Sequence, residues 1–433
     1  MDDLPKSYED EIKQLIEDGS DINAKDSHGS TFLHKCAKIG DIRGIKLLLE
    51  NKADFTAIDD ENRIPLHYAV LYGYKKIVKL FINQITINSK DRAGFTPLHF
   101  AAFCDDTELM RLLIENGAEV NEKDFQEHRT PLHLAAISCN SCRNIKILLE
   151  KGAEIELQDV NLNTPLFLAV KNNKMKVIEY LIKSGSNIEM RDSEGNTVLF
   201  FIDQVKVAKL IINRYRKNKD KLMNFISLIN KHGLDALDYA VYHNNKNVAK
   251  FLKAKTGNIK PDRLSQAIYT GNLEAVKLLL ELGADVNSMD EDRNNPLHIA
   301  AGAGYMQIVK FFLKVISSIN NRNLSGYTPL HFAIQNNHFD ITKILIENHA
   351  DLSIECNNNL TPIDLFINEH FEEVRGNKEL IGFFIYHINK QEKEYKKKLK
   401  LSFFLPLLIK SNRRKMNIYK TIKNKLKSLV LTF

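Results

Sequence analysis

Histidine recurs in this chain at a nearly constant spacing. Successive copies lie 32 to 34 residues apart in two series, and five of the six are preceded directly by Pro-Leu. An imidazole can ligate a metal, act as a general base or bond to the backbone. The chemistry of these side chains therefore depends on the element that repeats around them. The six are His34, His67, His99, His133, His298 and His331.

Other residue types take the same position in further copies, so the repeat tolerates the loss of the imidazole. These residues are Phe167, Phe200, Asp238, Ser265 and Asp364. Neighbouring copies on packed helix pairs would also lie roughly 10 Å apart, too far to share one zinc ion with bonds of about 2 Å. The sequence has no phosphate-binding loop, H-E-x-x-H motif or nucleophile elbow. We therefore expect no catalytic, metal or cofactor site, and a protein that is not an enzyme.

Cys139 and Cys142 form a single C-x-x-C pair within "ISCNSCRN". Zinc sites of this kind need a second pair or a histidine pair nearby, and a loop between two helices of one repeat is expected here instead. The chain has five cysteines, an odd number that favours free thiols in a reducing compartment. We expect both side chains to be free.

Each unit continues in the same way after its histidine. A polar break such as "KIGD" precedes an amphipathic segment such as "IRGIKLLLE" or "ELMRLLIE", whose apolar residues recur at helical spacing. Glycine then follows in "NGAEVN" and "LGADVN", where a left-handed residue would end the helix. Two short helices cannot bury an apolar face alone, and stacked copies can.

These features resemble the ankyrin-repeat family. The period, the T-P-L-H box and the "LLLExGADVN" ending recur together over residues 9–388, in ten to eleven units. The resemblance implies an all-α ankyrin-repeat solenoid of helix-turn-helix units with hairpin fingers along one edge. We expect an N-terminal capping half-repeat over 1–25, an array over 26–388 and a basic C-terminal tail over 389–433.

The box is typical of a helix start. Threonine takes the N-cap position, where its hydroxyl accepts from a free backbone N–H, and proline takes the first helical position, where its missing N–H costs nothing. In the family that these repeats resemble, the histidine bonds back to the threonine and to the neighbouring loop. The residues given this structural role are Thr96, Pro97, His99, Thr130, His133, Thr328 and His331.

Residues 204–261 depart from the period. The segment lacks the glycine turn between helices and carries a cluster of basic residues: Arg214, Arg216, Lys217, Lys219 and Lys221. Either an irregular repeat or a boundary between two stacks would explain it. We favour the irregular repeat, because the apolar ends of both flanks need cover.

Large side chains at finger positions and on the first helices are the candidates for binding a partner. Exposed aromatic residues and arginine anchor interfaces more often than serine or lysine. The competing interpretation is that each packs on its own neighbour. The candidates are Arg63, Phe95, Phe103, Phe125, Arg129 and Tyr327.

The net charge of +7 belongs to the C-terminal tail. From Lys390 onward there are fourteen Lys or Arg and two Glu, so the rest of the chain carries −5. Four interpretations stay open for the tail: a helical cap on the last repeat, a contact with an anionic membrane, a contact with nucleic acid, or a targeting address. "FLPLLIKS" has the Leu-Pro of an F-box-like segment that recruits a ubiquitin ligase, but lacks its acidic residue.

The composition predicts a soluble protein of the cell interior that acts as a monomer. No stretch approaches the 18 to 20 apolar residues of a membrane span, and the acidic start is not a secretory signal. We predict a protein-interaction scaffold whose concave face and fingers hold unidentified proteins. The alternative is a host-directed effector or substrate adaptor acting through the tail. Richness in Lys, Asn and Ile is typical of intracellular bacteria and large DNA viruses, which suggests secretion into a host.

Overall fold

The computed structural model describes residues 7–83, 85–257, 259–369, 378–401 and 406–431. Within these ranges the regular structure is helical, with no strand. The chain divides into two compact units, residues 1–239 and 240–433, and each is described by itself. The all-α repeat fold expected from the sequence is confirmed.

Unit 1 consists of a first helix followed by helix pairs. Its elements are α1 (Glu9–Glu17), α2 (Phe32–Ile39), α3 (Ile42–Glu50), α4 (Pro65–Leu71), α5 (Lys75–Phe81), α6 (Pro97–Phe103), α7 (Thr107–Glu115), α8 (Pro131–Ser138), α9 (Arg143–Glu150), α10 (Pro165–Lys171), α11 (Met175–Lys183), η1 (Val198–Phe201), α12 (Val205–Ile212), η2 (Asn213–Tyr215) and α13 (Lys219–Ile226).

Unit 2 continues the pairs and ends in two long helices. Its elements are α15 (Lys246–Thr256), α16 (Asp262–Tyr269), α17 (Leu273–Glu281), α18 (Pro296–Gly302), α19 (Met306–Val315), α20 (Pro329–Gln335), α21 (Phe339–Glu347), α22 (Pro362–Glu369), α24 (Lys378–Leu401) and α25 (Pro406–Leu431). Helix α14 (Ala236–Tyr242) contains the division between the units, which falls inside the irregular segment 204–261.

The second helix of most repeats ends at a left-handed residue, as the glycine spacing predicts. Gly117, Gly152 and Gly185 have φ of 95°, 88° and 99°. Lys52 takes the corresponding position after α3 with φ 63°, a conformation that costs a side-chain-bearing residue roughly 1–2 kcal/mol. The glycines therefore end the helices and turn the chain toward the next finger.

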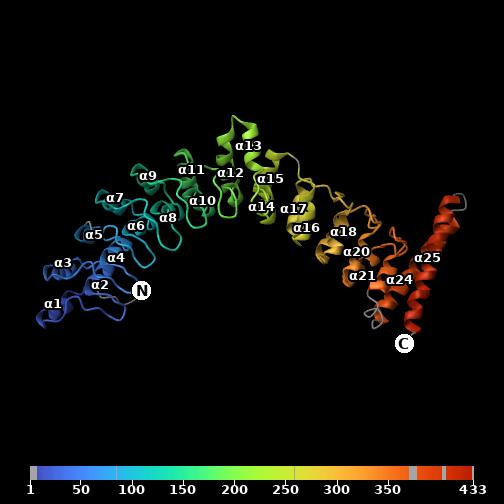
Figure 1. Ribbon diagram of the computed structural model, residues 1–433, viewed down its shortest axis with the longest axis horizontal. Helices are drawn as coiled ribbons and strands as arrows, with labels where there is room; N and C mark the ends of the chain where they lie inside the picture. Colours follow the sequence, from blue (N-terminus) through green and yellow to red (C-terminus); the bar gives the residue numbers. More distant parts are fainter. Residues whose placement is uncertain (1–6, 84, 258, 370–377, 402–405, 432–433) are drawn as a thin grey trace. The chain divides into compact units, whose positions relative to one another are not determined.

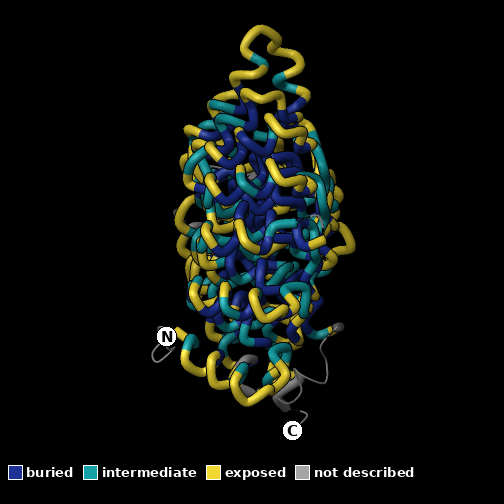
Figure 2. The backbone as a smooth tube through the Cα atoms, turned by 90° about the vertical axis from the view of Figure 1, so that its left-hand side faces the viewer, coloured by how far each residue is buried: buried dark blue, intermediate teal, exposed yellow. Residues whose placement is uncertain are grey.

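In unit 1 the first helices α2, α4, α6, α8 and α10 form an inner row, and the second helices α3, α5, α7, α9 and α11 form an outer row (Figure 1). Each inner helix packs on the inner helix of the next repeat. Buried residues lie between the rows, and exposed residues gather at the loops (Figure 2). The core consists mainly of leucine, isoleucine, valine and alanine from both rows. Each repeat is thus stabilised mainly by its neighbours.

The segment after Gly195 shortens the repeat. The first helix is reduced to the 3-10 turn η1, which packs on α10, and α12 follows after three residues and packs on α11. The chain then adds η2 and α13, and α13 stands beyond α12 at the outer side of unit 1 (Figure 1). The break in the period therefore corresponds to a shortened helix followed by an inserted one.

In unit 2 the tail folds into an antiparallel helical hairpin of α24 and α25. Lys415 of α25 bonds to Tyr395 of α24, and Tyr419 bonds to Gln391. The hairpin docks on the last repeats through Asp351. This carboxylate accepts from Lys415 at 2.6 Å and from Tyr419 at 2.8 Å. Burial raises the pKa of Asp351, but the bonds from Lys415 and Ser353 outweigh it and hold the pKa at about 2.

Candidate protein-interaction surface

The box histidines connect each repeat to the next through both ring nitrogens. At the start of α6, the backbone N–H of Thr96 lies 3.1 Å from His99 Nδ1, and the Thr96 hydroxyl lies 2.8 Å from it. His99 Nε2 lies 3.1 Å from the carbonyl oxygen of Arg129 in the next finger. A backbone N–H only donates and a carbonyl only accepts, so the ring is neutral with its proton on Nε2. Pro97 occupies the first turn beside it.

The same geometry recurs in both units. The Nε2 atoms contact backbone carbonyls of the following finger: His34 to Arg63, His67 to Phe95, His133 to Asn163, His298 to Tyr327 and His331 to Leu360. Thr130 and Thr328 bond to their histidines as Thr96 does. With both nitrogens engaged, these rings have no lone pair left for a metal ion.

Burial lowers the pKa of these imidazoles below the ordinary value of 6.5. For His67, His99, His133 and His331 the pKa falls to about 4, and the bond from Nε2 to a carbonyl opposes burial only in part. Protonation of Nδ1 would also set a donor against the backbone N–H. The rings are therefore neutral at physiological pH and serve as structural links.

Repeats without the histidine show what it contributes. Phe167 and Phe200 are buried in its place, and the hydroxyls of Thr164 and Thr197 are then buried without a hydrogen-bond partner among the described residues. An unsatisfied buried hydroxyl costs about 1–3 kcal/mol. The phenyl rings offset this cost by packing in the core, where the ring centroid of Phe167 lies 6.2 Å from that of Phe201.

Asp364 fills the position in the last repeat. Its Oδ2 accepts from the Thr361 backbone at 3.1 Å and from the Thr361 hydroxyl at 2.7 Å. Its other oxygen accepts from Lys425 of α25 at 2.5 Å. A carboxylate cannot donate to a following finger, and here it binds the cationic hairpin instead.

The fingers are joined in series by backbone hydrogen bonds. The N–H of Arg92 donates to the carbonyl of Glu61 at 2.7 Å, and the N–H of Phe125 donates to the carbonyl of Ala93 at 2.8 Å. Asp91, at the base of its finger, accepts from two backbone N–H groups of the same turn. The finger positions are therefore fixed before any partner binds.

A second link between repeats, made by asparagine, was not predicted from the sequence. Asn88 accepts from the N–H of Glu119 at 2.9 Å and donates to the carbonyl of Gly117 at 3.3 Å. Asn121 repeats both contacts one unit later. The recurring asparagine of "GAEVN" was the signal that could have revealed this link.

Arg63 and Phe95 pack on neighbours along the inner face of unit 1. The Arg63 guanidinium lies 5.6 Å from the Phe100 ring, and its Nε lies 3.3 Å from Asp91 Oδ2. The Phe95 ring lies 5.9 Å from Phe100 and 5.6 Å from His99. These two candidates are half-buried and form a fixed aromatic cluster with Phe100.

Phe103 and Phe125 remain open to solvent, with exposed fractions of 53% and 60%. Phe103 is the last residue of the inner helix α6. Phe125 lies on the next finger, where its ring covers Gly94 so closely that a Cβ there would meet it at 2.7 Å. Lys90 lies 5.0 Å above the same ring. Both rings are therefore accessible while Phe125 is held by its neighbours.

The remaining two candidates are Arg129 and Tyr327. Arg129 Nε lies 3.7 Å from Asp159 Oδ2. Tyr327 belongs to unit 2, where its ring stacks on His331 at 5.3 Å. The structure thus brings together Arg63 and Phe95 within unit 1 and places Tyr327 in the other unit.

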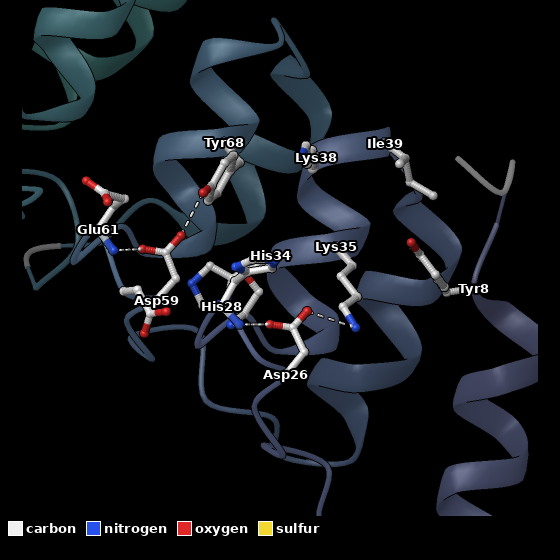
Figure 3. A pocket seen from close by; sticks show the side chains of 12 residues that line it. Tyr8, Asp26, His28, His34, Lys35, Lys38, Ile39, Asp59, Glu61 and Tyr68 are labelled. Atoms are coloured by element: carbon white, nitrogen blue, oxygen red, sulfur yellow. Dashed lines mark hydrogen bonds and ion pairs between the residues drawn. The ribbon is translucent and has the colours of Figure 1, made fainter. Parts of the chain in front are cut away.

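A polar hollow of about 460 Å³ lies at the N-terminal end of the inner face (Figure 3). Lys35 forms an ion pair with Asp26 at 3.1 Å, and Tyr68 donates to Asp59 at 2.6 Å. Each of these bonds joins two residues that line the hollow.

The C-x-x-C pair consists of free thiols. Cys139 is buried, and burial raises the pKa of its thiol to about 12. The thiolate is the form that attacks or binds metal, and burial suppresses it here.

Two family models match the chain. Both describe ankyrin repeats, and one of them covers residues 6–91, 81–159, 166–263 and 264–358. The chain belongs to the ankyrin-repeat family. The repeats of this family are in general protein-interaction modules, and the matched models describe no catalytic domain. Among the helices of the described residues, none carries an apolar stretch that could cross a bilayer.

Relatives match parts of this ankyrin-repeat chain. The Drosophila melanogaster transient receptor potential cation channel subfamily A member 1 is 31% identical over 157 residues, and inversin of Canis lupus familiaris is 30% identical over 164 residues. These stretches are 35% and 36% of the chain but only 13% and 15% of the relatives. The ankyrin-repeat domain of Bcl-3 matches 47% of the chain and 91% of its own, at 21% identity and a TM-score of 0.41.

Proposed function

We propose that unit 1 binds a partner protein through its inner helices and fingers, with Phe103 and Phe125 as the anchoring side chains. The observation that carries the proposal is the exposure of these two rings, 53% and 60%, on consecutive repeats of unit 1. Water-exposed phenyl rings cost solvation free energy that a partner surface recovers on contact.

The surroundings of the rings support this role. Arg63, Phe95 and Phe100 form a half-buried cluster that spans the repeat of Phe103 and the finger before it, so this part of unit 1 is already ordered. A preordered surface loses less conformational entropy on binding than a mobile one. We infer that the partner supplies apolar side chains to the two rings.

A capture experiment tests the proposal. The full chain, a Phe103→Ala/Phe125→Ala variant and a Leu80→Ala/Ile85→Ala control are used as baits, followed by identification of the captured proteins. Leu80 and Ile85 are also exposed, at 41% and 74%, but belong to α5 and the turn after it. We expect the control to keep a specific partner that the Phe variant loses. A partner lost equally from both, or kept by both, contradicts the assignment of this face.

A second proposal concerns the tail as an adaptor, a host-directed effector element or a membrane contact. The hairpin docks with Lys415 and Lys425, and it keeps Lys420 and Lys427 exposed, which could meet an acidic partner. The F-box-like segment 404–411 includes residues 404 and 405, which lie outside the described residues. If the hairpin acts in this way, replacing Lys420 and Lys427 by glutamine should abolish recruitment of the acidic partner. Unchanged recruitment of that partner would exclude these two contacts.

A further inference from the structure

The inserted segment of unit 1 carries a concentrated positive charge. Between Gln204 and Lys221 there are seven basic residues and one acidic residue, Asp220. The basic residues are Lys206, Lys209, Arg214, Arg216, Lys217, Lys219 and Lys221. They lie on α12, η2, the following turn and the start of α13, and we call them the basic spur.

The charges of the basic spur face solvent. All seven side chains are exposed. None forms an ion pair with an acidic side chain in the part of the chain that the structure describes, whereas Lys183 of α11 pairs with Glu179 at 2.9 Å. Cations spaced this closely repel one another, so the surface gains free energy when a polyanion binds.

The spur is held in place rather than free to move. The ring of Tyr215 packs against Phe225 of α13 at 5.1 Å, and its hydroxyl donates to Glu189 of the preceding repeat. Asn218 caps α13 by accepting from the N–H of Lys221 at 2.9 Å. The backbone that presents the cations is therefore ordered before binding.

We propose that the basic spur binds the phosphate backbone of a nucleic-acid duplex. Its side chains supply charge and donors but no exposed aromatic ring, because Tyr215 is engaged with Phe225. This composition matches a phosphate contact, which needs charge alone, rather than base stacking. It also lacks the exposed apolar side chains with which surface helices enter a bilayer; the nearest, Ile229, follows α13. The spur lies at the outer side of unit 1 (Figure 1), away from the inner helix row that holds Phe103.

Fluorescence anisotropy with a labelled 20-base-pair DNA duplex tests the proposal on the full chain. The spur variant replaces Arg214, Arg216, Lys217, Lys219 and Lys221 by glutamine. Each phosphate contact steepens the fall of log affinity with log salt by about 0.9. We therefore expect the variant to reduce the slope by about 4 and to weaken binding roughly 100-fold or more at 0.1 M salt.

The matched control removes the same number of charges from the tail. It replaces Lys393, Lys397, Lys420, Lys423 and Lys427 by glutamine, and we expect it to keep most of the affinity and the slope. A Arg214→Lys/Arg216→Lys variant should bind like the unmodified chain, because it preserves charge.

The proposal would be overturned if the chain did not bind the duplex at 50 mM salt, or if the spur variant bound it as tightly as the unmodified chain. Loss of duplex binding in the tail control alone would also overturn it. Vesicles containing phosphatidylserine form a second arm. Tighter, spur-dependent binding to vesicles than to the duplex would assign the spur to a membrane and refute a nucleic-acid site. Circular dichroism checks that each variant keeps its helices.

Discussion

Mild acid should destabilise this protein through its box histidines. In the folded chain the pKa values of His67, His99, His133 and His331 lie at about 4, whereas an unfolded histidine titrates near 6.5. Between these values the unfolded state binds more protons than the folded state. Stability is therefore fully present above about pH 6.5 and is lost as the pH falls toward 4.

The magnitude follows from the width of that interval. Each pH unit below 6.5 costs about 1.4 kcal/mol per histidine until the folded ring also protonates. At pH 5 the loss is about 2 kcal/mol for each of the four rings. Such a loss is large against an ordinary stability of 5–15 kcal/mol. Buried carboxylates contribute mainly at lower pH, since the pKa of Asp351 lies at about 2.

Urea unfolding at pH 7.5 and pH 5, monitored by circular dichroism, measures the effect. A Thr130→Val/His133→Phe variant places phenylalanine at the box position, as at Phe167, and removes one titrating ring. The difference in unfolding free energy between the two pH values should then shrink by about 2 kcal/mol, whatever the variant does to stability at pH 7.5. The Cε1 proton shifts of the remaining rings should titrate near pH 4.

If the unfolding free energy of the variant changes between the two pH values as much as that of the unmodified chain, the box histidines do not cause the acid sensitivity. Titration of the buried rings near pH 6.5 in the folded protein would also refute this cause, because burial and the backbone bonds at Nδ1 and Nε2 would then not lower the pKa.

Three further changes have expected outcomes in urea unfolding at neutral pH. Thr130→Val should lower the free energy of unfolding by about 1 kcal/mol, because the Thr130 hydroxyl bonds to the box histidine. Thr164→Val should be neutral or stabilising, because the Thr164 hydroxyl has no hydrogen-bond partner among the described residues. Gly94→Ala should cost more than Gly117→Ala, about 2 kcal/mol or more against about 1, since both have positive φ but only Gly94 meets the next finger; equal costs would discount the finger contact. Tyr419→Phe should destabilise unit 2 by about 2 kcal/mol through the lost bond to a buried carboxylate, and an unchanged midpoint would show that the hairpin does not depend on it.

The repeat architecture could be predicted because each rule is local and is repeated many times. Proline at Pro97 and glycine at Gly117 mark where helices begin and end, whatever the distant residues do. The irregular segment 204–261 could be located for the same reason, since it lacks the glycine turn between helices that its neighbours carry. Its inserted helix α13 could not be assigned a position, because nothing in the period specifies where an added helix packs.

The interface candidates show which property could not be predicted from the sequence, namely the exposure of each side chain. Arg63, Phe95 and Phe125 were equivalent in the sequence as large residues at fingers. Their exposure differs because of contacts from other repeats: Phe100 holds Arg63 and Phe95, while Phe125 lies on Gly94 with most of its ring in water. Such contacts depend on which residue the next repeat places opposite, and side-chain type alone does not encode it.

The sequence by itself determined the family and the residues that start and end the repeated helices, and the family resemblance implied the linking role of the box histidines. Those features depend on short-range spacing and on backbone groups that every repeat supplies. Only the tertiary structure shows where the basic tail lies, as a hairpin docked on the last repeats. Asp351 and Asp364 come within reach of Lys415 and Lys425 only after α25 folds back on α24. Residues more than 60 positions apart form these ion pairs, so their energy depends on the packing of the hairpin and has no local signature.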